Sequence, residues 1–346
     1  MTEPAPPDPA PPEGGAITVN VLTGFLGSGK THLLNRLLRL TELGGVAVLI
    51  NEFGEVGLDH LLVEALDDEV VLLASGCVCC SIRGDLKEAL IGLHDRMRRG
   101  LVPPFDRVVL ETTGLADPGP IVATLTADPV LCHHFRLGNI VTVVDALAGL
   151  HNLDAHPEAL HQAAVADRLV ISKTDMAAPD RLEALRTRLR AINPAAEVIE
   201  SGADSPVPAT LLVSDIHRPG AREAEVARWL AAEGDGAGHG HHHHHHDGSV
   251  RAFVLSAGAP LDWAAFGLWL SMLLNRHGTR ILRVKGLLDI RGVDSPVVIH
   301  GVQHTIHRPE HLAAWPDGDR RTRLVFIVDG LDPALIRRSF SAFVTG

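Results

Sequence analysis

The stretch Gly24-Phe25-Leu26-Gly27-Ser28-Gly29-Lys30-Thr31 decides how the rest of the chain is interpreted. It fits the pattern G-x-x-x-x-G-K-[ST], the phosphate-binding P-loop of nucleoside triphosphatases. An apolar run at residues 17–23 precedes it, and helical periodicity follows over residues 31–42. A strand, a glycine-rich loop and a helix in this order surround phosphates with backbone N–H groups and the positive end of a helix dipole. The sequence therefore predicts a P-loop domain that binds a nucleoside triphosphate.

The motif also indicates what its individual residues do. We expect Lys30 to reach the β- and γ-phosphates and to be catalytic, and the Thr31 hydroxyl to bind Mg²⁺. The residues expected to contact the nucleotide at this loop are Gly24, Gly27, Ser28, Gly29, Lys30, Thr31 and the neighbouring His32.

The apolar runs that follow the motif predict the fold class. They are rich in Val, Ile and Leu and show no clear polar alternation, which is typical of strands buried on both faces of a parallel sheet. Stretches with helical periodicity separate them, so we expect a doubly wound, mostly parallel α/β sheet. The runs lie at residues 46–51, 70–74, 107–111, 140–145, 168–173 and, more weakly, 197–201.

Composition along the chain suggests four regions. Residues 1–16 form a Pro-rich acidic tail that we expect to be disordered, and residues 17–215 form the P-loop domain. Residues 216–249 form a linker with one helix near residues 221–232 and a Gly- and His-rich segment. Residues 250–346 predict a smaller α+β domain with helices at 261–275 and from 333. Its strands are expected near residues 251–256, 281–285, 287–291, 297–304 and 323–328.

The charge balance bears on partners and location. Lys and Arg number 31 against 42 Asp and Glu, a formal net charge of −11, which disfavours a nucleic-acid partner. The apolar runs are too short or too charged to span a membrane, and the N-terminus lacks the features of a secretory signal. We therefore expect a cytoplasmic protein with neither nucleic-acid nor membrane partners.

Two later motifs lie where a P-loop domain places functional residues. Glu111 ends an apolar run and begins Glu-Thr-Thr-Gly, the place of a Walker-B acid. It is a second catalytic candidate that could hold Mg²⁺ through water or position the attacking water, against the alternative of a solvated strand end. Ser172-Lys173-Thr174-Asp175 is similar to the N-K-x-D guanine reader, so Lys173 and Asp175 are expected to contact the base. Ser172 replaces the usual Asn, which removes one amide that braces the loop.

Three cysteines within four positions, Cys77, Cys79 and Cys80, follow the run at residues 70–74. Such clustering in a reducing compartment indicates metal or redox chemistry, and thiolates suit Zn²⁺, Cu⁺ and Co²⁺. An extended segment pairs Cys77 with Cys79, whereas a turn pairs Cys77 with Cys80. Two or three of the cysteines could therefore ligate one metal ion, and a further ligand would come from elsewhere or from a partner. The alternative is a group of buried structural cysteines, and the lone Cys132 is interpreted as an ordinary thiol.

Further metal ligands could come from two other segments. Glu52 and Glu55 follow the second apolar run, where they could complete the metal shell, contact Mg²⁺ or simply form a solvated acidic loop. The linker histidines could concentrate metal near the cysteines, against the alternative of an inert polar linker. These histidines are His239, His241, His242, His243, His244, His245 and His246.

The chain resembles the CobW family of metallochaperone GTPases in five features taken together. These are the P-loop, the Cys-x-Cys-Cys cluster, the segment Asn51–Glu55, the segment 111–118 and the His-rich linker. That family is related to the nickel-handling GTPases of hydrogenase and urease maturation. The resemblance implies a GTPase that delivers a metal, often Zn²⁺ and in some members Co²⁺, to client enzymes. It implies that Cys77, Cys79 and Cys80 ligate this metal. His32 stands where the family usually has a second Thr.

The leading hypothesis is therefore a GTP-dependent zinc chaperone in which bound nucleotide sets the geometry of the cysteine cluster. Cobalt delivery for cobalamin synthesis is the alternative within the class. A nucleotide-dependent metal store or sensor without a client is the alternative outside it, and a small-molecule kinase lacks a readable acceptor site. Metal or nucleotide binding could also drive oligomer formation.

Overall fold

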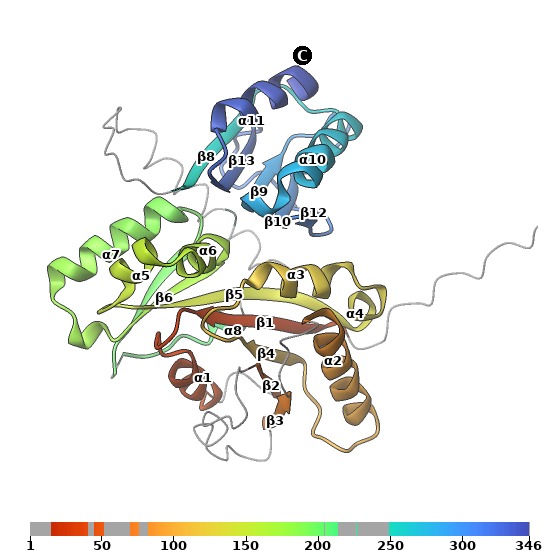
Figure 1. Ribbon diagram of the computed structural model, residues 1–346. Coiled ribbons are helices and arrows are strands. Elements are labelled where there is room, and N and C mark those ends of the chain that lie inside the picture. The colour runs from red at the N-terminus through yellow and green to blue at the C-terminus, as the bar shows by residue number, and fades with distance from the viewer. Residues whose placement is uncertain are drawn as a thin grey trace, which may run out of the picture.

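The computed structural model describes residues 15–40, 45–51, 70–75, 82–203, 205–213, 226 and 249–345. Two sheets organise them, a parallel sheet up to residue 201 and an antiparallel sheet from residue 250 (Figure 1). The helices of the first part lie on both faces of the first sheet, and α3 and α6 separate the two sheets in the view of Figure 1. An α/β domain with a smaller α+β domain behind it is the predicted fold class, and it is confirmed.

The first sheet is built of seven strands in the order β3-β2-β4-β1-β5-β6-β7, and each neighbouring pair is parallel. The central strand β1 lies between β4 and β5, so loops from the carboxyl ends of these three strands meet at one edge. The strands are β1 (Ile17–Gly24), β2 (Val46–Asn51), β3 (Val70–Ser75), β4 (Arg107–Glu111), β5 (Phe135–Asp145), β6 (Arg168–Ser172) and β7 (Glu197–Ser201).

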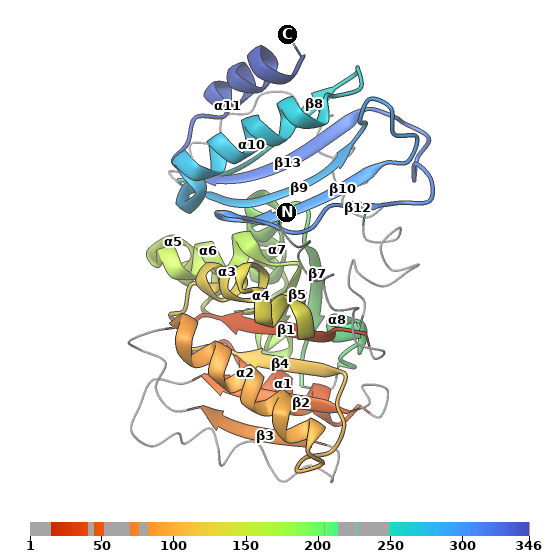
Figure 2. The ribbon, with the colours of Figure 1, turned by 90° about the vertical axis from the view of Figure 1, so that its right-hand side faces the viewer.

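Helices cover this sheet on both faces, which explains why its strands show no polar alternation. Helices α1 (Lys30–Leu38) and α8 (Thr210–Val213) pack on one face. The opposite face carries a larger apolar core beneath six helices (Figure 2). These are α2 (Ile82–Arg98), α3 (Pro118–Ala127), α4 (Pro129–His134), α5 (Gly149–Ala155), α6 (Pro157–Val165) and α7 (Pro179–Ile192).

Local sequence explains where several helices begin. Asp117, Asp128 and Asp332 each precede a proline, and each side chain accepts hydrogen bonds from N–H groups of the first turn. Asp in the cap and Pro in the first turn are favourable, because the first N–H groups of a helix have no partner within it. Helix α1 differs, because Gly29 caps it without a side-chain hydrogen bond.

The second sheet has the order β11-β10-β9-β13-β8, its neighbours are antiparallel, and β12 pairs with β10. Its strands are β8 (Val250–Ala257), β9 (Ile281–Leu288), β10 (Val297–Val302), β11 (Thr305–Ile306), β12 (Glu310–His311) and β13 (Thr322–Asp329). The expectation of two strands at residues 281–285 and 287–291 was wrong. Gly286 continues β9 without a turn, because it pairs with Ile299 on one side and Leu324 on the other.

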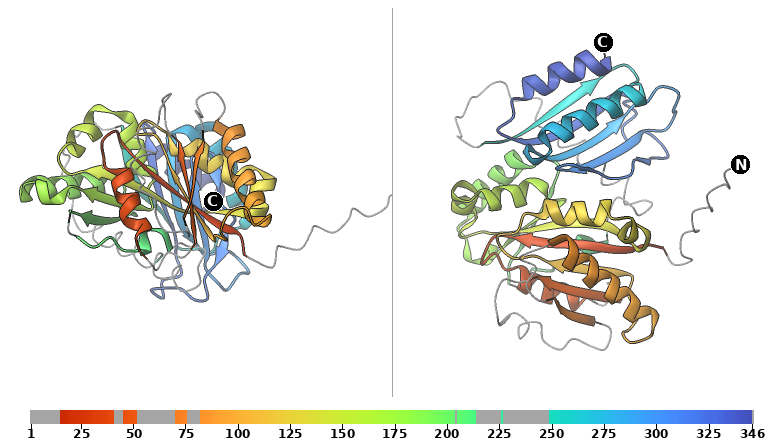
Figure 3. Two further views of the ribbon diagram at one scale, coloured as in Figure 1. Left: turned by 90° about the horizontal axis from the view of Figure 1, so that it is seen from below. Right: turned by 45° about the vertical axis from the view of Figure 1, so that its right-hand side comes forward.

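The two faces of the second sheet pack differently. Helices α10 (Trp263–His277) and α11 (Pro333–Phe340) cover one face around Phe326, on the side away from the first sheet (Figures 2 and 3). The other face packs on the first domain, since Leu282 and Ile327 belong to the same core as helices α3 and α6. The central strands β9 and β13 are therefore buried on both sides, like the parallel strands.

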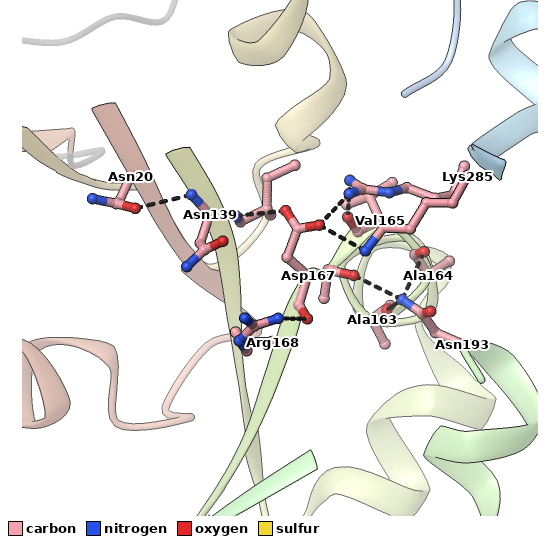
Figure 4. A network of polar contacts seen from close by, with 12 residues as sticks. Asn20, Asn139, Ala163, Ala164, Val165, Asp167, Arg168, Asn193 and Lys285 are labelled. Carbon is pink, nitrogen blue, oxygen red and sulfur yellow. Dashed lines mark hydrogen bonds and ion pairs between the residues drawn. The ribbon is translucent and has the colours of Figure 1, made fainter. Parts of the chain in front are cut away.

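Charged residues are also buried at this contact (Figure 4). Asp167, just before β6, pairs with Arg283 and Lys285 of β9, with 3.0 Å between Lys285 Nζ and Asp167 Oδ1. Burial raises the pKa of Asp167, but the charges of Arg283 and Lys285 outweigh it and hold that pKa well below its usual range. An ion cluster thus joins the two domains. None of the helices in the part of the chain that the structure describes is both long and apolar enough to cross a membrane.

Candidate functional site

The carboxyl edge of the parallel sheet brings together residues that are far apart in the sequence. Strand β1 leads into the P-loop, β4 ends at Glu111, β5 ends at Asp145 and β6 ends at Ser172. Because all these strands are parallel, their ends meet on one side of the sheet, which is where doubly wound domains bind ligands.

The P-loop has the backbone shape that its glycines permit. Gly24, Gly27 and Gly29 have φ angles of 144°, 71° and 92°, in the region that L side chains rarely adopt. At Gly24 a Cβ atom would also lie 2.3 Å from the Val143 carbonyl oxygen, so no other residue fits against β5. The uncapped N-terminus of α1 leaves its first N–H groups directed at the loop, which suits an anionic phosphate.

The last two residues of the P-loop motif, Lys30 and Thr31, make different hydrogen bonds. Lys30 Nζ donates to the carbonyl oxygens of Gly24 at 3.0 Å and Phe25 at 3.3 Å. Thr31 Oγ1 donates to Glu111 Oε1 at 2.6 Å, although the residues are 80 positions apart. A hydroxyl and a buried carboxylate side by side are the hard oxygen donors that Mg²⁺ prefers, so this pair fits the ion. The exposed side chain of His32 lies one residue further along α1.

The residues that follow Glu111 form hydrogen bonds with β1 and with α6. Thr112 Oγ1 donates to Thr23 Oγ1 at 2.8 Å, which joins the ends of β4 and β1. Gln162 of α6 donates from Nε2 to the carbonyl oxygens of Gly114 at 3.1 Å and Ala116 at 3.0 Å. Gln162 was not predicted as a functional residue from the sequence. Its signal was a lone amide among the apolar residues of α6, since a buried amide needs hydrogen-bond partners.

Ser172 and Lys173 brace the P-loop from the side. Ser172 Oγ donates to the Ser28 carbonyl oxygen at 2.6 Å, and Lys173 Nζ donates to the Gly27 carbonyl oxygen at 2.9 Å. Ser172 therefore still braces the loop through a hydroxyl, although the amide of the usual Asn is absent. Lys173 Nζ also contacts Asp145 Oδ2 at 2.6 Å. Asp145 was not predicted as a site residue, although it is an acidic residue that ends an apolar strand, like Glu111.

Asp175 lies beside the loop after β7, which was not predicted as part of the site. Asp175 Oδ1 accepts a hydrogen bond from the Ala203 backbone N–H at 3.0 Å. Arg36 of α1 supports the same loop, because its guanidinium donates to Ser201 Oγ and the Gly202 carbonyl oxygen, both at 2.9 Å. The end of β7 thus lies next to Asp175 and forms a side of the same site.

The proposed metal ligands lie outside the described residues. This holds for Cys77, Cys79 and Cys80, for Glu52 and Glu55, and for His239, His241, His242, His243, His244, His245 and His246. The described strand β3 ends at Ser75 and α2 begins at Ile82, so the cysteines belong to the connection after β3. Among the residues that the structure describes, there is no group of three or more His, Cys, Asp or Glu side chains able to hold a metal ion.

Comparison with known proteins identifies both domains. Residues 18–200 match the family model "CobW/HypB/UreG, nucleotide-binding domain", and residues 250–344 match "Cobalamin synthesis protein cobW C-terminal domain". The zinc chaperone YjiA of Escherichia coli strain K12 is 32% identical over 332 residues, which cover 94% of this chain and 98% of YjiA. The zinc chaperone CobW of a Sinorhizobium species is 29% identical and covers 95% of this chain and 98% of its own.

A solved structure agrees with the sequence comparison. The crystal structure of Zn(II)-bound YjiA GTPase from Escherichia coli is 28% identical to this chain and gives a TM-score of 0.69. The match covers 95% of this chain and 99% of that one. The match to the nucleotide-binding family model covers more than half of this chain, and the match to a relative of 32% identity covers 94% of it. This chain therefore belongs to the CobW/HypB/UreG family of nucleotide-binding proteins and carries the CobW C-terminal domain.

Proposed function

We propose that this P-loop GTPase binds Zn²⁺ at its cysteine segment and uses GTP hydrolysis to deliver it to client proteins. The observation that carries the proposal is the shared edge of the parallel sheet. The P-loop follows β1, Glu111 ends β4, and the cysteine segment begins directly after β3. A change in the bound nucleotide at this edge can therefore act on metal ligands that are connected to it. The names of the zinc chaperones YjiA and CobW support zinc as the cargo.

At the nucleotide site we assign roles from the contacts. Thr31 and Glu111 would hold Mg²⁺, which would neutralise charge on the β- and γ-phosphates. Lys30 would leave the carbonyl oxygens of Gly24 and Phe25 and bind the phosphates, because an ammonium gains more from an anion than from neutral carbonyls. Glu111 would also orient the attacking water, since it is buried at the end of β4 beside Thr31.

Guanine recognition would fall to Lys173 and Asp175. A carboxylate accepts hydrogen bonds from N1 and N2 of guanine, whereas adenine has no such pair of donors. The aliphatic part of Lys173 would cover the base, because its ammonium is already held by Gly27 and Asp145. The Ala203 backbone contact supports this role by fixing the orientation of the Asp175 carboxylate.

The cargo would be held by Cys77, Cys79 and Cys80. Glu52 or Glu55 could complete the shell, and the linker histidines from His239 to His246 would collect the metal at lower affinity. The reduced thiolates that this role requires favour the cytoplasm. Client metalloproteins, and oligomers formed on metal or nucleotide binding, are the expected partners. Cobalt remains a second candidate cargo, because the C-terminal family is named for cobalamin synthesis.

The proposal requires that nucleotide and metal binding depend on each other. Zn²⁺ and Co²⁺ would be titrated against chelator competitors, with GDP or a non-hydrolysable GTP analogue bound. A coupling of about 1–3 kcal/mol predicts a difference of roughly 5- to 150-fold between the two nucleotide states, and the same factor for GTP affinity with and without metal. Cys79→Ser should remove the coupled site. Cys132→Ser is the matched control, because this thiol lies on α4 and contacts the Leu125 carbonyl oxygen. Equal affinities in both nucleotide states would refute the proposal.

A further inference from the structure

The C-terminal domain touches the nucleotide-binding domain at the segment that follows Glu111. Gln303, in the turn between β10 and β11, donates from Nε2 to Asp117 Oδ2 at 2.9 Å. Asp117 also caps α3, because its Oδ1 accepts from the Gly119 N–H at 2.9 Å. One carboxylate thus connects the start of α3 to a residue 186 positions later in the chain.

The backbone at Gln303 is unusual for such a residue. Its φ angle is 50°, in the left-handed region where Gly and Asn are favoured, and Lys173 is the other non-glycine residue with positive φ among those described. A turn that only reversed the chain would be more stable with Gly at this position. The Gln side chain therefore does something that a turn alone does not require, and its observed contact is Asp117.

Gly119 leaves room for this contact. A Cβ atom at Gly119 would lie 2.2 Å from Gln303 Oε1, so any larger residue would displace the Gln303 amide. Helix α3 packs on β10 and β11 around this point. The start of α3 is thus shaped to receive the turn of the C-terminal domain.

The other end of the same segment also leads to the C-terminal domain. Gln162 of α6 holds the carbonyl oxygens of Gly114 and Ala116. Its neighbour His161 lies 3.1 Å from Asp329 of β13. The segment between Glu111 and α3 is therefore held at Asp117 directly and at Gly114 and Ala116 through α6, in both cases next to residues of the C-terminal domain.

We infer that Gln303 is a positioning residue for GTP hydrolysis, through which the C-terminal domain holds the segment Glu111–Asp117 in its catalytic position. The inference rests on the GTPase activity and not on the identity of the metal. Glu111 and Thr31 are in contact at one end of this segment, so a displacement that begins at Asp117 moves the carboxylate away from the Mg²⁺ and water positions. Turnover then depends on a domain that contributes no residue to the P-loop.

The test uses a hydrogen-bond pair that can be broken and rebuilt. Gln303→Glu places a carboxylate against the Asp117 carboxylate, and kcat should fall about three- to tenfold, the effect of one lost hydrogen bond. Asp117→Asn should change kcat less than twofold, because Asn still caps α3 and the Gln303 amide can turn to accept. The double variant pairs an amide with a carboxylate again and should recover kcat to within about twofold of the unaltered protein.

Two further variants provide an independent test of the contact and a control for the added charge. Gly119→Ala should lower kcat like Gln303→Glu, because it displaces Gln303 while leaving every hydrogen-bonding group in place. Asn275→Asp is the matched control, since it adds the same charge on an exposed position of α10, on the far face of the second sheet. KM for GTP and affinity for a fluorescent GDP analogue should stay unchanged throughout, and Tm should fall by no more than about 4 °C, the effect of one lost hydrogen bond. These readouts separate positioning from loss of fold or of nucleotide binding.

All rates would be measured as phosphate release from the full chain without added zinc. Unchanged kcat in Gln303→Glu, or a loss that the double variant does not recover, would overturn the inference and leave the proposed function untouched. Absence of GTP hydrolysis in the unaltered protein would instead overturn the proposed function and the inference together.

Discussion

Replacing Asp167 by Asn would test how strongly the ion cluster joins the two domains. Asp167 is buried and pairs with Arg283 and Lys285 (Figure 4). The exposed fractions of these two residues are 3% for Arg283 and 1% for Lys285. The Ile140 N–H also donates to Asp167 Oδ2 at 3.0 Å, and an Asn oxygen can still accept it. The substitution therefore removes mainly the charge that faces two buried cations.

The expected cost follows from this burial. Breaking a buried ion pair by removing one partner costs about 3–5 kcal/mol, because the remaining charge stays in a poor solvent. Asp154→Asn is the matched control, since Asp154 forms an ion pair with Arg188 while 67% of its side chain is exposed. Exposed pairs contribute about 0–1 kcal/mol, so this variant should resemble the unaltered protein.

The assay is urea unfolding followed by Trp fluorescence, because Trp269 is buried in the core of the C-terminal domain. Asp167→Asn should lower the unfolding midpoint clearly and Asp154→Asn should not. Replacing Asp167 by Asn together with Arg283 and Lys285 by Met should recover most of the loss, since no buried charge is then left unpaired and the Asn oxygen still accepts from the Ile140 N–H. Equal midpoints for the two Asp→Asn variants would refute the account of this interface.

Two other predictions follow from single residues. Asp175→Asn should lower kcat/KM for GTP about 10- to 100-fold and raise that for XTP, because hydrogen bonds to a charged group are worth about 1.5–3 kcal/mol, and steady-state kinetics with both nucleotides would show it; unchanged preference would contradict the guanine assignment. Burial and the charges of Lys285 and Arg283, with a smaller effect of His307, hold the pKa of His300 well below 6.5, although the nearby Asp167 carboxylate acts in the opposite direction and raises it. Because this folded-state pKa is depressed, the free energy of unfolding should fall as the pH drops below about 6.5, by at most about 1.4 kcal/mol per pH unit from this group. Urea unfolding between pH 7 and 5 would measure it, and an equal slope in His300→Gln would contradict the assignment.

Local patterns in the sequence were enough for the parallel sheet. Each of its strands contains a Val-, Ile- and Leu-rich run, and the P-loop motif marks the central one, β1, although β5 begins at Phe135, five residues before the run predicted for it. The prediction was wrong at β9, where two strands were expected, at residues 281–285 and 287–291, with Gly286 between them. A glycine ends a strand or lies within it depending on its neighbours, here Ile299 and Leu324, which come from distant parts of the chain.

The site was predictable only where a motif keeps its residues close in sequence. The contact between Thr31 and Glu111 could be expected, because both residues belong to known motifs of one fold. Gln162, Asp145 and Gln303 belong to none, and their roles depend on partners 28 to 186 positions away. Such contacts are fixed by tertiary packing, which local patterns do not encode.

The most direct test of zinc delivery follows metal and phosphate in a single turnover. Protein loaded with one Zn²⁺ and with GTP would be mixed with Mg²⁺, a phosphate sensor and the chromogenic zinc acceptor 4-(2-pyridylazo)resorcinol. The account predicts that zinc reaches the acceptor at the rate of phosphate release, and that it stays bound with a non-hydrolysable GTP analogue or in Glu111→Gln. Zinc transfer at one rate in all three samples would contradict the claim that hydrolysis drives delivery.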